Sequence, residues 1–384
     1  MSLCENVGDR MRDCQSRLEL IDKAISSEMN QDFRQRRFRL LEFLYSERKV
    51  YSQVISELNA VCQALKEEGI GNPPFVIALD GLTDVGNAQQ NMLLDTSLNK
   101  RIYRVATWGG IGDVLLITPT LRALKRSHPG CRIYVYCITK AHEEALRNNQ
   151  YIDRLIHLGS SKLKRGIYYL LYQLFGREKI HMFNYDRLAP SLFYKKNAAK
   201  IIGEMIGVEI GDPRPDCFLT EAEETEGRRI ASKYPNPVAI HVTGKCSPNK
   251  SWSIKNWEEL VIKNPSYNFL QLGLRDDELV RGAEDLRGTS LRQAFSVIKA
   301  ARAFIGIDSA FAHAATALRT PAVVLFGAST PMVWGHEGNQ NLYQAPRCSP
   351  CIDRLFNDPC PYGNLCMSNI TVPDVERALS LSLM

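Results

Sequence analysis

The sequence predicts an α/β protein in which two sets of alternating strands and helices follow one another, with a helical segment ahead of them. Three observations support this class. Short apolar runs alternate with helical stretches from residue 101 onward, a glycine-rich turn follows the first run, and a proline-rich connector at 212–215 divides the two sets. The chain has 384 residues, which is too long for one ordinary core, so two or three domains are expected.

The composition is that of a folded protein. Apolar residues make up 45% of the chain and charged residues 23%. The net charge of +6 fits an anionic small ligand or a weak attraction to an acidic membrane surface, and it does not call for a nucleic-acid groove. The sequence shows neither a signal-peptide pattern nor an apolar run of about 18 residues. We therefore expect a cytoplasmic protein without a transmembrane segment.

Residues 1–70 are expected to form a helical domain. Residues 8–68 contain no proline and one glycine, and apolar residues recur there at helical spacing. Arginines are dense between 34 and 39, which favours a solvated helix face over a surface for a partner or acceptor. Residues 71–100 are interpreted as a linker or as the start of the first α/β domain.

The first α/β set occupies 101–215. Its first elements are expected to be a strand, a glycine-rich turn, a helix and a second strand, at 102–107, 108–113, 114–127 and 132–137. Gly110 and Gly112 would let the backbone approach a ligand closely. Leu115 stands where a dinucleotide fingerprint needs its third glycine, and no acid ends the second strand, so an NAD or FAD site is not favoured.

Asp113 is the candidate catalytic residue of this set. It follows the glycine-rich turn at the carboxyl end of the first expected strand, where open α/β sheets place their ligands. A carboxylate there could take a proton from an incoming hydroxyl group. The alternative is that Asp113 only caps the helix, and the two roles are compatible.

The second α/β set occupies 216–347. Before residue 303, a strand, a loop, a helix, a strand and a helix are expected at 238–242, 243–252, 256–263, 269–274 and 290–301. Lys245 and Lys250 lie on the loop, where a lysine could neutralise a phosphate as a point charge. For either lysine alone, plain solvation is the favoured interpretation.

Residues 303–327 read as a strand, a helix and a parallel strand. Asp308 and Ser309 fall at the corner between the first strand and the helix. Unpaired N–H groups and the positive end of the helix dipole make such a corner a seat for a phosphate. Capping of the helix by either side chain is the alternative.

The motifs of both sets resemble those of the heptosyltransferases of glycosyltransferase family nine, over about residues 101–384. The similar stretches are, in order, Trp-Gly-Gly-Ile-Gly-Asp113-Val-Leu-Leu-Ile-Thr-Pro119, then His241-Val-Thr243 and Lys250-Ser-Trp252, then Gly306-Ile-Asp308-Ser309-Ala310-Phe-Ala-His313. The resemblance implies a GT-B fold, in which two Rossmann-like domains face each other. These would be an acceptor domain at 101–215 and a nucleotide-sugar domain at 216–347.

The resemblance also implies a reaction and its residues. An ADP-activated heptose, or another nucleotide sugar, would bind in the second domain and react with an acceptor hydroxyl in the first, with inversion and without a catalytic metal. Asp113 matches the general base and Lys250 the diphosphate contact. Ala310 stands where the family often has glycine, and Asp276 is the expected ribose contact, with Asp277 and Glu278 as alternatives. The full set of expected donor contacts is Gly110, Gly112, Thr243, Trp252, Asp276, Asp308, Ser309, Ala310 and His313.

Four cysteines lie close together near the C-terminus: Cys348, Cys351, Cys360 and Cys366. Four thiolates in so short a span suit a tetrahedral structural metal site, and both zinc and iron accept four sulfurs. Four ordinary free cysteines are the alternative. Similar clusters bind iron in the branch of the family that modifies autotransporters, so the resemblance slightly favours iron. A helix at 367–384 would follow this finger at 348–366.

The residues ahead of the first α/β set also resemble that branch. We therefore expect a homo-oligomeric enzyme that transfers heptose to Ser or Thr hydroxyls of an autotransporter adhesin. Three alternatives stay open: a heptosyltransferase of the lipopolysaccharide core, a catalytically silent metal-binding scaffold, and a nucleotide-sugar epimerase.

Overall fold

The computed structural model describes most of the α/β part of the chain and seven helical residues near the N-terminus. The rest of the expected helical domain at 1–70 and all of 71–100 lie outside the described residues, as do Trp108 and Lys245. Residues 1–100 with 158–179 form one compact unit, and 101–157 with 180–384 form a second, which is the subject below. The described residues are 102–107, 109–158, 179–181, 196–244, 247–344, 346–352 and 359–384, with Arg12, Gln15, Ser16, Glu19, Leu20, Asp22 and Lys23.

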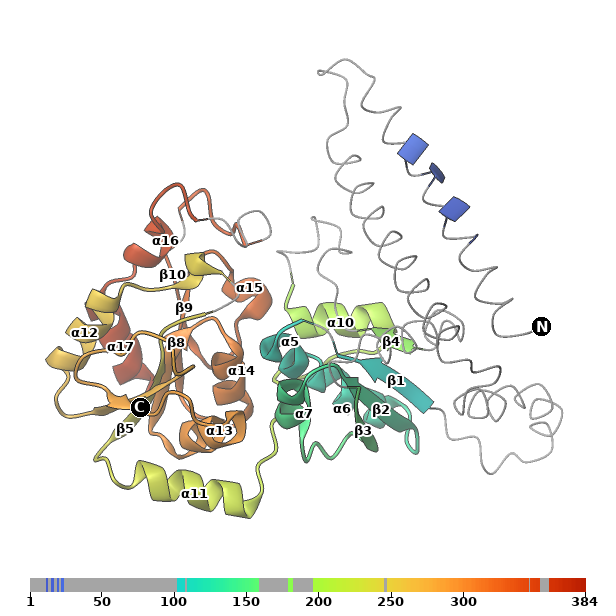
Figure 1. Ribbon diagram of the computed structural model, residues 1–384, viewed down its shortest axis with the longest axis horizontal. Coiled ribbons are helices and arrows are strands. Elements are labelled where there is room, and N and C mark those ends of the chain that lie inside the picture. Colours follow the sequence, from blue (N-terminus) through green and yellow to red (C-terminus); the bar gives the residue numbers. More distant parts are fainter. Residues whose placement is uncertain are drawn as a thin grey trace, which may run out of the picture. The chain divides into compact units, whose positions relative to one another are not determined.

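The second unit contains two sheets, each of which defines a lobe. The sheet of the first lobe has four strands in the order β3–β2–β1–β4 (Figure 1). β1, β2 and β3 are parallel, with Ile102 beside Arg132 and Tyr134 beside Arg154. Its strands are β1 (Ile102–Ala106), β2 (Arg132–Cys137), β3 (Arg154–His157) and β4 (Lys179–His181). Its helices are α5 (Ile111–Leu116), α6 (Thr118–Ser127), α7 (Lys140–Leu146) and α10 (Ala198–Ile206).

The single helix expected at 114–127 is two helices, and this corrects the expectation. α5 ends at Leu116 and α6 begins at Thr118. Pro119 explains the break, because proline has no N–H to donate and its ring clashes with the carbonyl four residues earlier. That carbonyl belongs to Leu115, and the Thr118 hydroxyl donates to it at 2.7 Å. The new helix therefore starts with proline in its first turn, where proline is tolerated.

The second lobe is built on a six-stranded parallel sheet in the order β10–β9–β8–β5–β6–β7. Every residue of β8 and of β9 is buried, as expected of central parallel strands covered on both faces. Its strands are β5 (Pro237–His241), β6 (Asn268–Leu272), β7 (Glu284–Asp285), β8 (Ala303–Ile307), β9 (Ala322–Phe326) and β10 (Gln340–Tyr343). The alternation of strands and helices predicted from the sequence is therefore confirmed in both lobes.

Helices cover this second sheet on both faces (Figure 1). α11 and α13 pack closely because Gly227 has no side chain, and a Cβ there would collide with the backbone of Ser296. The helical elements are α11 (Glu221–Ala231), the 3-10 helix η2 (Pro248–Lys250), α12 (Ile254–Lys263), α13 (Leu291–Ala300), α14 (Ala310–Ala317), α15 (Pro331–Trp334), α16 (Leu365–Ser368) and α17 (Val372–Ser382).

The connector between the lobes is fixed to the first lobe by a buried arginine. Arg122 of α6 pairs with the Asp216 carboxylate and donates to the backbone oxygens of Asp212 at 2.7 Å and Arg214 at 3.0 Å. Burial raises the pKa of Asp216, and the guanidinium of Arg122 opposes that rise. The proline-rich segment is therefore held at several points rather than only stiffened by its prolines.

A second buried arginine, on α13, contacts both lobes. Arg292 forms a two-point ion pair with Glu223 at 2.8 and 2.6 Å, and it donates to the Phe218 oxygen at 2.6 Å. It also donates to the Glu144 oxygen of α7 at 3.2 Å. The bond to α7 joins the second lobe to the first, so loss of this arginine would loosen the lobe contact.

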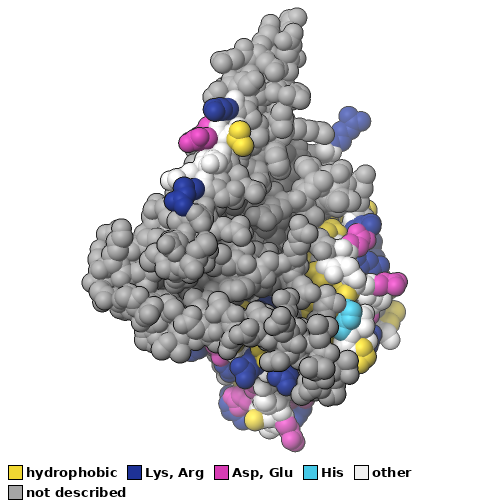
Figure 2. Space-filling view, turned by 90° about the vertical axis from the view of Figure 1, so that its right-hand side faces the viewer, with side chains coloured by type: hydrophobic (Ala, Val, Ile, Leu, Met, Phe, Trp, Pro, Cys, Tyr) yellow, Lys and Arg dark blue, Asp and Glu magenta, His cyan; other side chains and the backbone are white. Residues whose placement is uncertain are grey.

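Among the described residues, no helix is long and apolar enough to cross a bilayer. On the face that Figure 2 presents, basic and acidic side chains of the described residues lie interspersed.

Candidate active site

Asp113 lies folded back over the glycine-rich turn that precedes it. The Gly110 N–H donates to its Oδ2 at 2.8 Å. Gly109 has φ +77°, and a Cβ on it would stand 2.5 Å from that oxygen, so only glycine fits there. The carboxylate thus caps the first turn of α5, as the alternative interpretation expected, and it does so at the carboxyl end of β1.

A buried histidine, which sequence reasoning missed, holds this turn from behind. His142 of α7 lies with Nδ1 2.9 Å from the Thr107 hydroxyl and Nε2 3.1 Å from the Gly109 carbonyl. A carbonyl only accepts, so Nε2 carries the proton that it donates to Gly109. Burial lowers the pKa of His142, which keeps the ring neutral. The only sequence signal for His142 was its position in the first turn of α7, where its backbone N–H donates to the Thr139 hydroxyl.

On the second lobe, Lys250 and Asp308 form a buried ion pair. The Lys250 ammonium stands 2.7 Å from Asp308 Oδ2, and the two side chains are 12% and 3% exposed. Burial alone would raise the pKa of Asp308, but Lys250 and His313 outweigh it and the pKa lies below its usual value. The ring of Trp334 lies 5.9 Å from the same ammonium. Solvation of Lys250, the favoured local interpretation, is therefore wrong.

Ser309 stands at the N-cap position of α14 without capping it by its side chain. Its hydroxyl instead bonds Nδ1 of His241 at 3.0 Å. Burial lowers the pKa of His241 to about 4, so this ring is neutral. The N-terminus of α14, which begins at Ala310, thus carries no cap from Ser309. Helix N-terminal N–H groups of this kind bind anions.

The two lobes meet where α5 and α14 lie side by side (Figure 1). A Cβ at Gly112 would stand 3.1 Å from Cδ2 of His313 and 3.7 Å from Cα of Ala310. His313 is buried, and its Nε2 stands 4.0 Å from Asp308 Oδ1. Its Nδ1 is 2.8 Å from Nε2 of His336, a second residue that the sequence did not reveal. The turn of the first lobe that carries Asp113 and the corner of the second lobe that carries Asp308 therefore lie next to each other.

Two further expected donor contacts, Trp252 and Thr243, differ in their surroundings. Trp252 is buried, packs edge-on against Trp257 at 5.0 Å, and donates its indole N–H to the Ile370 oxygen at 2.9 Å. Trp252 is a core residue that anchors the loop after Lys250. Because its ring is buried and its N–H is bonded within the protein, the expectation that it contacts the donor is corrected. Thr243 lies partly buried just after β5.

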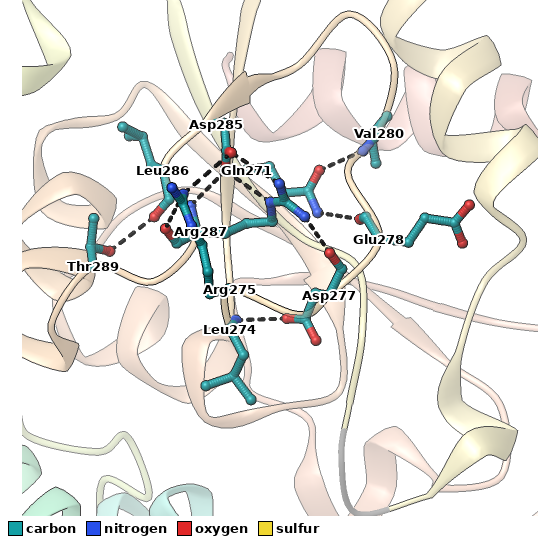
Figure 3. A network of polar contacts seen from close by, with 10 residues as sticks. All are labelled: Gln271, Leu274, Arg275, Asp277, Glu278, Val280, Asp285, Leu286, Arg287 and Thr289. Atoms are coloured by element: carbon teal, nitrogen blue, oxygen red, sulfur yellow. Dashed lines mark hydrogen bonds and ion pairs between the residues drawn. The ribbon is translucent and has the colours of Figure 1, made fainter.

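The loop after β6 carries the three candidates for a ribose contact, of which Figure 3 shows Asp277 and Glu278. Asp277 accepts from the Leu274 N–H at 2.7 Å, and Arg287 donates to its backbone oxygen. Arg287 also holds Asp285 at 2.8 and 2.9 Å, which fixes the loop against the edge of the sheet. The Asp277 carboxylate therefore stabilises the loop itself, whereas Asp276 and Glu278 are exposed.

The four C-terminal cysteines gather near the end of β9. The pKa of Cys366 is raised to about 11, mainly by burial and to a smaller extent by the neighbouring Cys351, Cys360 and Cys348. The Cys351 N–H donates to the Ala328 oxygen at 2.8 Å. No three His, Cys, Asp or Glu side chains in the described part of the chain are arranged to hold a metal ion. The donor chemistry fits a thiolate-bound metal, but the finger is not confirmed.

Several solved glycosyltransferases are similar in fold to this chain. A glycosyl transferase family 9 protein from Veillonella parvula aligns at TM-score 0.58 and 17% identity, over 75% of this chain and 98% of that one. The E. coli ADP-heptose lipopolysaccharide heptosyltransferase II aligns at 0.55 and 16%, over 74% and 98%. TibC from enterotoxigenic E. coli, described as an iron-containing dodecameric glycosyltransferase, aligns at 0.53 and 17%, over 74% and 76%. The parallel α/β fold expected from the sequence is therefore that of GT-B glycosyltransferases.

The family model described as glycosyltransferase family 9 (heptosyltransferase) matches residues 191–355. No curated protein matches the sequence. The matched range contains Lys250, Asp308 and His313, the second-lobe part of the candidate site. Residues 191–355 therefore match the glycosyltransferase family 9 (heptosyltransferase) model, and the described fold is similar to that of solved members of that family.

Proposed function

We propose that the protein transfers heptose, with inversion, from an ADP-activated donor to Ser or Thr hydroxyls of a protein acceptor such as an autotransporter adhesin. One observation carries the reaction type: the turn with Asp113 and the corner with Lys250 and Asp308 meet at the contact between Gly112 and His313. A carboxylate from one lobe and a cation with a helix N-terminus from the other are the groups that such a transfer needs.

On the acceptor side, Asp113 acts as general base. It takes the proton of the acceptor hydroxyl as that oxygen forms a bond to the anomeric carbon of the heptose. The Gly110 N–H and the glycine-rich turn hold the carboxylate in place, and His142 holds the turn. The acceptor oxygen is a weak nucleophile, so a positioned base is what makes it reactive.

On the donor side, the bond from the anomeric carbon to the diphosphate oxygen breaks and ADP leaves. Its developing charge is stabilised by the Lys250 ammonium and by the N-terminus of α14. Asp308 accepts from the Lys250 ammonium at 2.7 Å and thereby holds it at the corner where α14 begins. Ala310 leaves a methyl group beside the approach to the helix N-terminus, where the related sequences often have glycine.

The choice of a protein acceptor rests on two likenesses. TibC, whose fold this chain shares, has also been solved in complex with ADP-D-beta-D-heptose and is described as a dodecameric iron-containing heptosyltransferase. The four-cysteine segment is the second, because four thiolates can bind iron and TibC is described as iron-containing. A lipopolysaccharide core acceptor is the second candidate, favoured by the equally good alignment with heptosyltransferase II.

The same comparison motivates two further parts of the proposal. We propose that Cys348, Cys351, Cys360 and Cys366 hold a structural iron or zinc ion, and that the protein is a homo-oligomer. The closeness of Cys351, Cys360 and Cys348 to Cys366, whose pKa they raise, supports the first. Metal analysis and an absorption spectrum of the purified protein test it, with Cys217→Ser as the control for Cys348→Ser. A metal content equal in both variants would contradict the site.

Incubation of the purified protein with ADP-heptose and each acceptor tests the function. Mass spectrometry of a co-expressed adhesin fragment should show heptose on Ser or Thr, and Lys250→Ala should abolish it. Lys255→Ala is the matched control, since this lysine is exposed on the neighbouring helix α12. Transfer to lipopolysaccharide core alone would replace the protein acceptor by the second candidate. Release of free sugar without any acceptor would indicate an epimerase.

A further inference from the structure

His313 and His336 form a buried pair whose hydrogen bond can be made in only two ways. Nδ1 of His313 stands 2.8 Å from Nε2 of His336, and the rings cross at 84°. The side chains are 4% and 5% exposed. Burial lowers the pKa of both rings, that of His336 to about 3. Both are therefore neutral, and one of the two facing nitrogens carries the proton.

The far nitrogen of His336 distinguishes the two ways. Its Nδ1 is buried, and within the described part of the chain it has no hydrogen-bond partner. If the proton of the pair sat on His313, this Nδ1 would be an N–H without an acceptor. Buried N–H groups without acceptors are rarer than unmet lone pairs, because a donor has no second way to be satisfied. The proton therefore belongs on Nε2 of His336, which donates to His313.

The far nitrogen of His313 gives the same answer independently. Its Nε2 faces the Asp308 carboxylate at 4.0 Å. A lone pair aimed at a carboxylate is repelled, whereas an N–H is attracted. If His336 donates to Nδ1 of His313, then Nε2 must carry the remaining proton. Both ends of the pair thus require the same arrangement.

We propose that His336 is a positioning residue, which fixes His313 as the tautomer whose Nε2–H points to the place where the two lobes meet. This deepens the proposed function and rests on it. The Cβ position of Gly112 lies 3.5 Å from that nitrogen and 3.7 Å from Cα of Ala310, at the start of α14. The Nε2–H therefore lies between the Asp308 carboxylate and the first turn of α5, at the edge of the region assigned to the donor diphosphate. There it acts as a neutral donor beside the cation of Lys250.

A role limited to filling the core predicts something different. His336 also accepts through its backbone oxygen from Asn339 and Asn341, so the ring lies in a well-ordered turn. A purely structural ring would be replaceable by another planar apolar side chain, without any effect on the proton positions of His313. The test must therefore read those protons directly as well as the activity.

The first measurement is the tautomer of His313 in the intact protein, by nitrogen-15 NMR with labelled histidine. Wild type should show His313 with the proton on Nε2, and His336→Gln should keep it, since the glutamine amide can donate from the same place. In His336→Phe the donor is lost, and His313 should shift toward a mixture of tautomers. A wild-type His313 protonated on Nδ1 would overturn the inference without any variant.

The second measurement is kcat/KM for ADP-heptose, with His157→Phe as the control for a histidine of the first lobe away from the site. We expect roughly a tenfold loss in His336→Phe, less than threefold in His336→Gln and none in the control. Equal activity of wild type and folded His336→Phe would overturn the positioning role. If wild type itself neither binds nor uses the nucleotide sugar, the proposed function fails, while the tautomer measurement still stands or falls by itself.

Discussion

Gly112 on α5 and His313 on α14 belong to different lobes and lie in direct contact. The Cβ position of Gly112 is 3.1 Å from Cδ2 of the imidazole. The contact exists because α5 and α14 both begin at the carboxyl ends of parallel strands, and the two ends face each other. Parallel α/β sheets place their ligands at these ends. Two such ends in contact bring a carboxylate from one sheet and a phosphate-binding corner from the other to one ligand.

The absence of a side chain at Gly112 should matter for activity more than for stability. Gly112→Ala adds a methyl group that pushes against His313, while alanine favours the helix by about 0.5–1 kcal/mol. We expect the free energy of unfolding to change by less than about 1 kcal/mol and kcat/KM to fall at least roughly tenfold. Gly211→Ala is the control, since nothing lies near its Cβ position. Full activity of Gly112→Ala would argue against a ligand at this contact.

The buried pair of Lys250 and Asp308 should be costly to break from one side. Lys250→Met leaves a carboxylate without its cation in the interior, which costs about 3–5 kcal/mol. The double variant with Asp308→Asn should be more stable than the single one, because no unpaired charge remains. Urea unfolding measures both. Lys263→Met is the control: its pair with Glu259 has a similar distance of 2.6 Å but is exposed, so the effect should be small.

His142 should influence catalysis without touching the donor. His142→Phe removes the bond to the Gly109 carbonyl and frees the turn that holds Asp113. We expect kcat to fall roughly tenfold, as for loss of one buried hydrogen bond, with KM for the nucleotide sugar little changed. Steady-state kinetics at varied donor concentration distinguishes the two constants. A rise in KM alone would place His142 on the donor side and contradict this assignment.

Acid should loosen the contact between Glu223 and Arg292. The hydrogen bonds of Arg292 lower the pKa of Glu223 from 4.5 to about 2. The carboxylate thus contributes stability that is complete above pH 4.5 and is lost as the pH falls toward 2. We expect roughly 2 kcal/mol over that window, allowing for solvent screening. Thermal unfolding of wild type and Glu223→Gln between these pH values measures it, and identical pH profiles would contradict it.

The order of strands and helices was predictable from the sequence because it follows from local pattern. The apolar runs at 303–307 and 322–326 are β8 and β9, and the polar residues between them stand where a strand passes into a helix. The break between α5 and α6 also has a local cause, because Pro119 cannot continue the hydrogen-bond pattern of α5.

Side-chain partners were less predictable, because they depend on residues far apart in the chain. Trp252 reads as part of a ligand-binding motif, yet its indole bonds a carbonyl 118 residues later. His142 and His336 belong to no motif, and their roles arise only from the folding of the turn and of α14 beside them. Asp113 and Asp308 became candidates because the strand ends beside them can be located from sequence, whereas Lys250 became one only through the family resemblance.

The most direct test of the account is heptosyl transfer by Asp113→Asn alongside the binding of ADP-heptose. The amide can still accept from Gly110 but cannot take a proton, so binding should match wild type while transfer falls by roughly a hundredfold or more. Transfer at the wild-type rate, with binding intact, would contradict the claim that one lobe supplies the base and the other the phosphate seat.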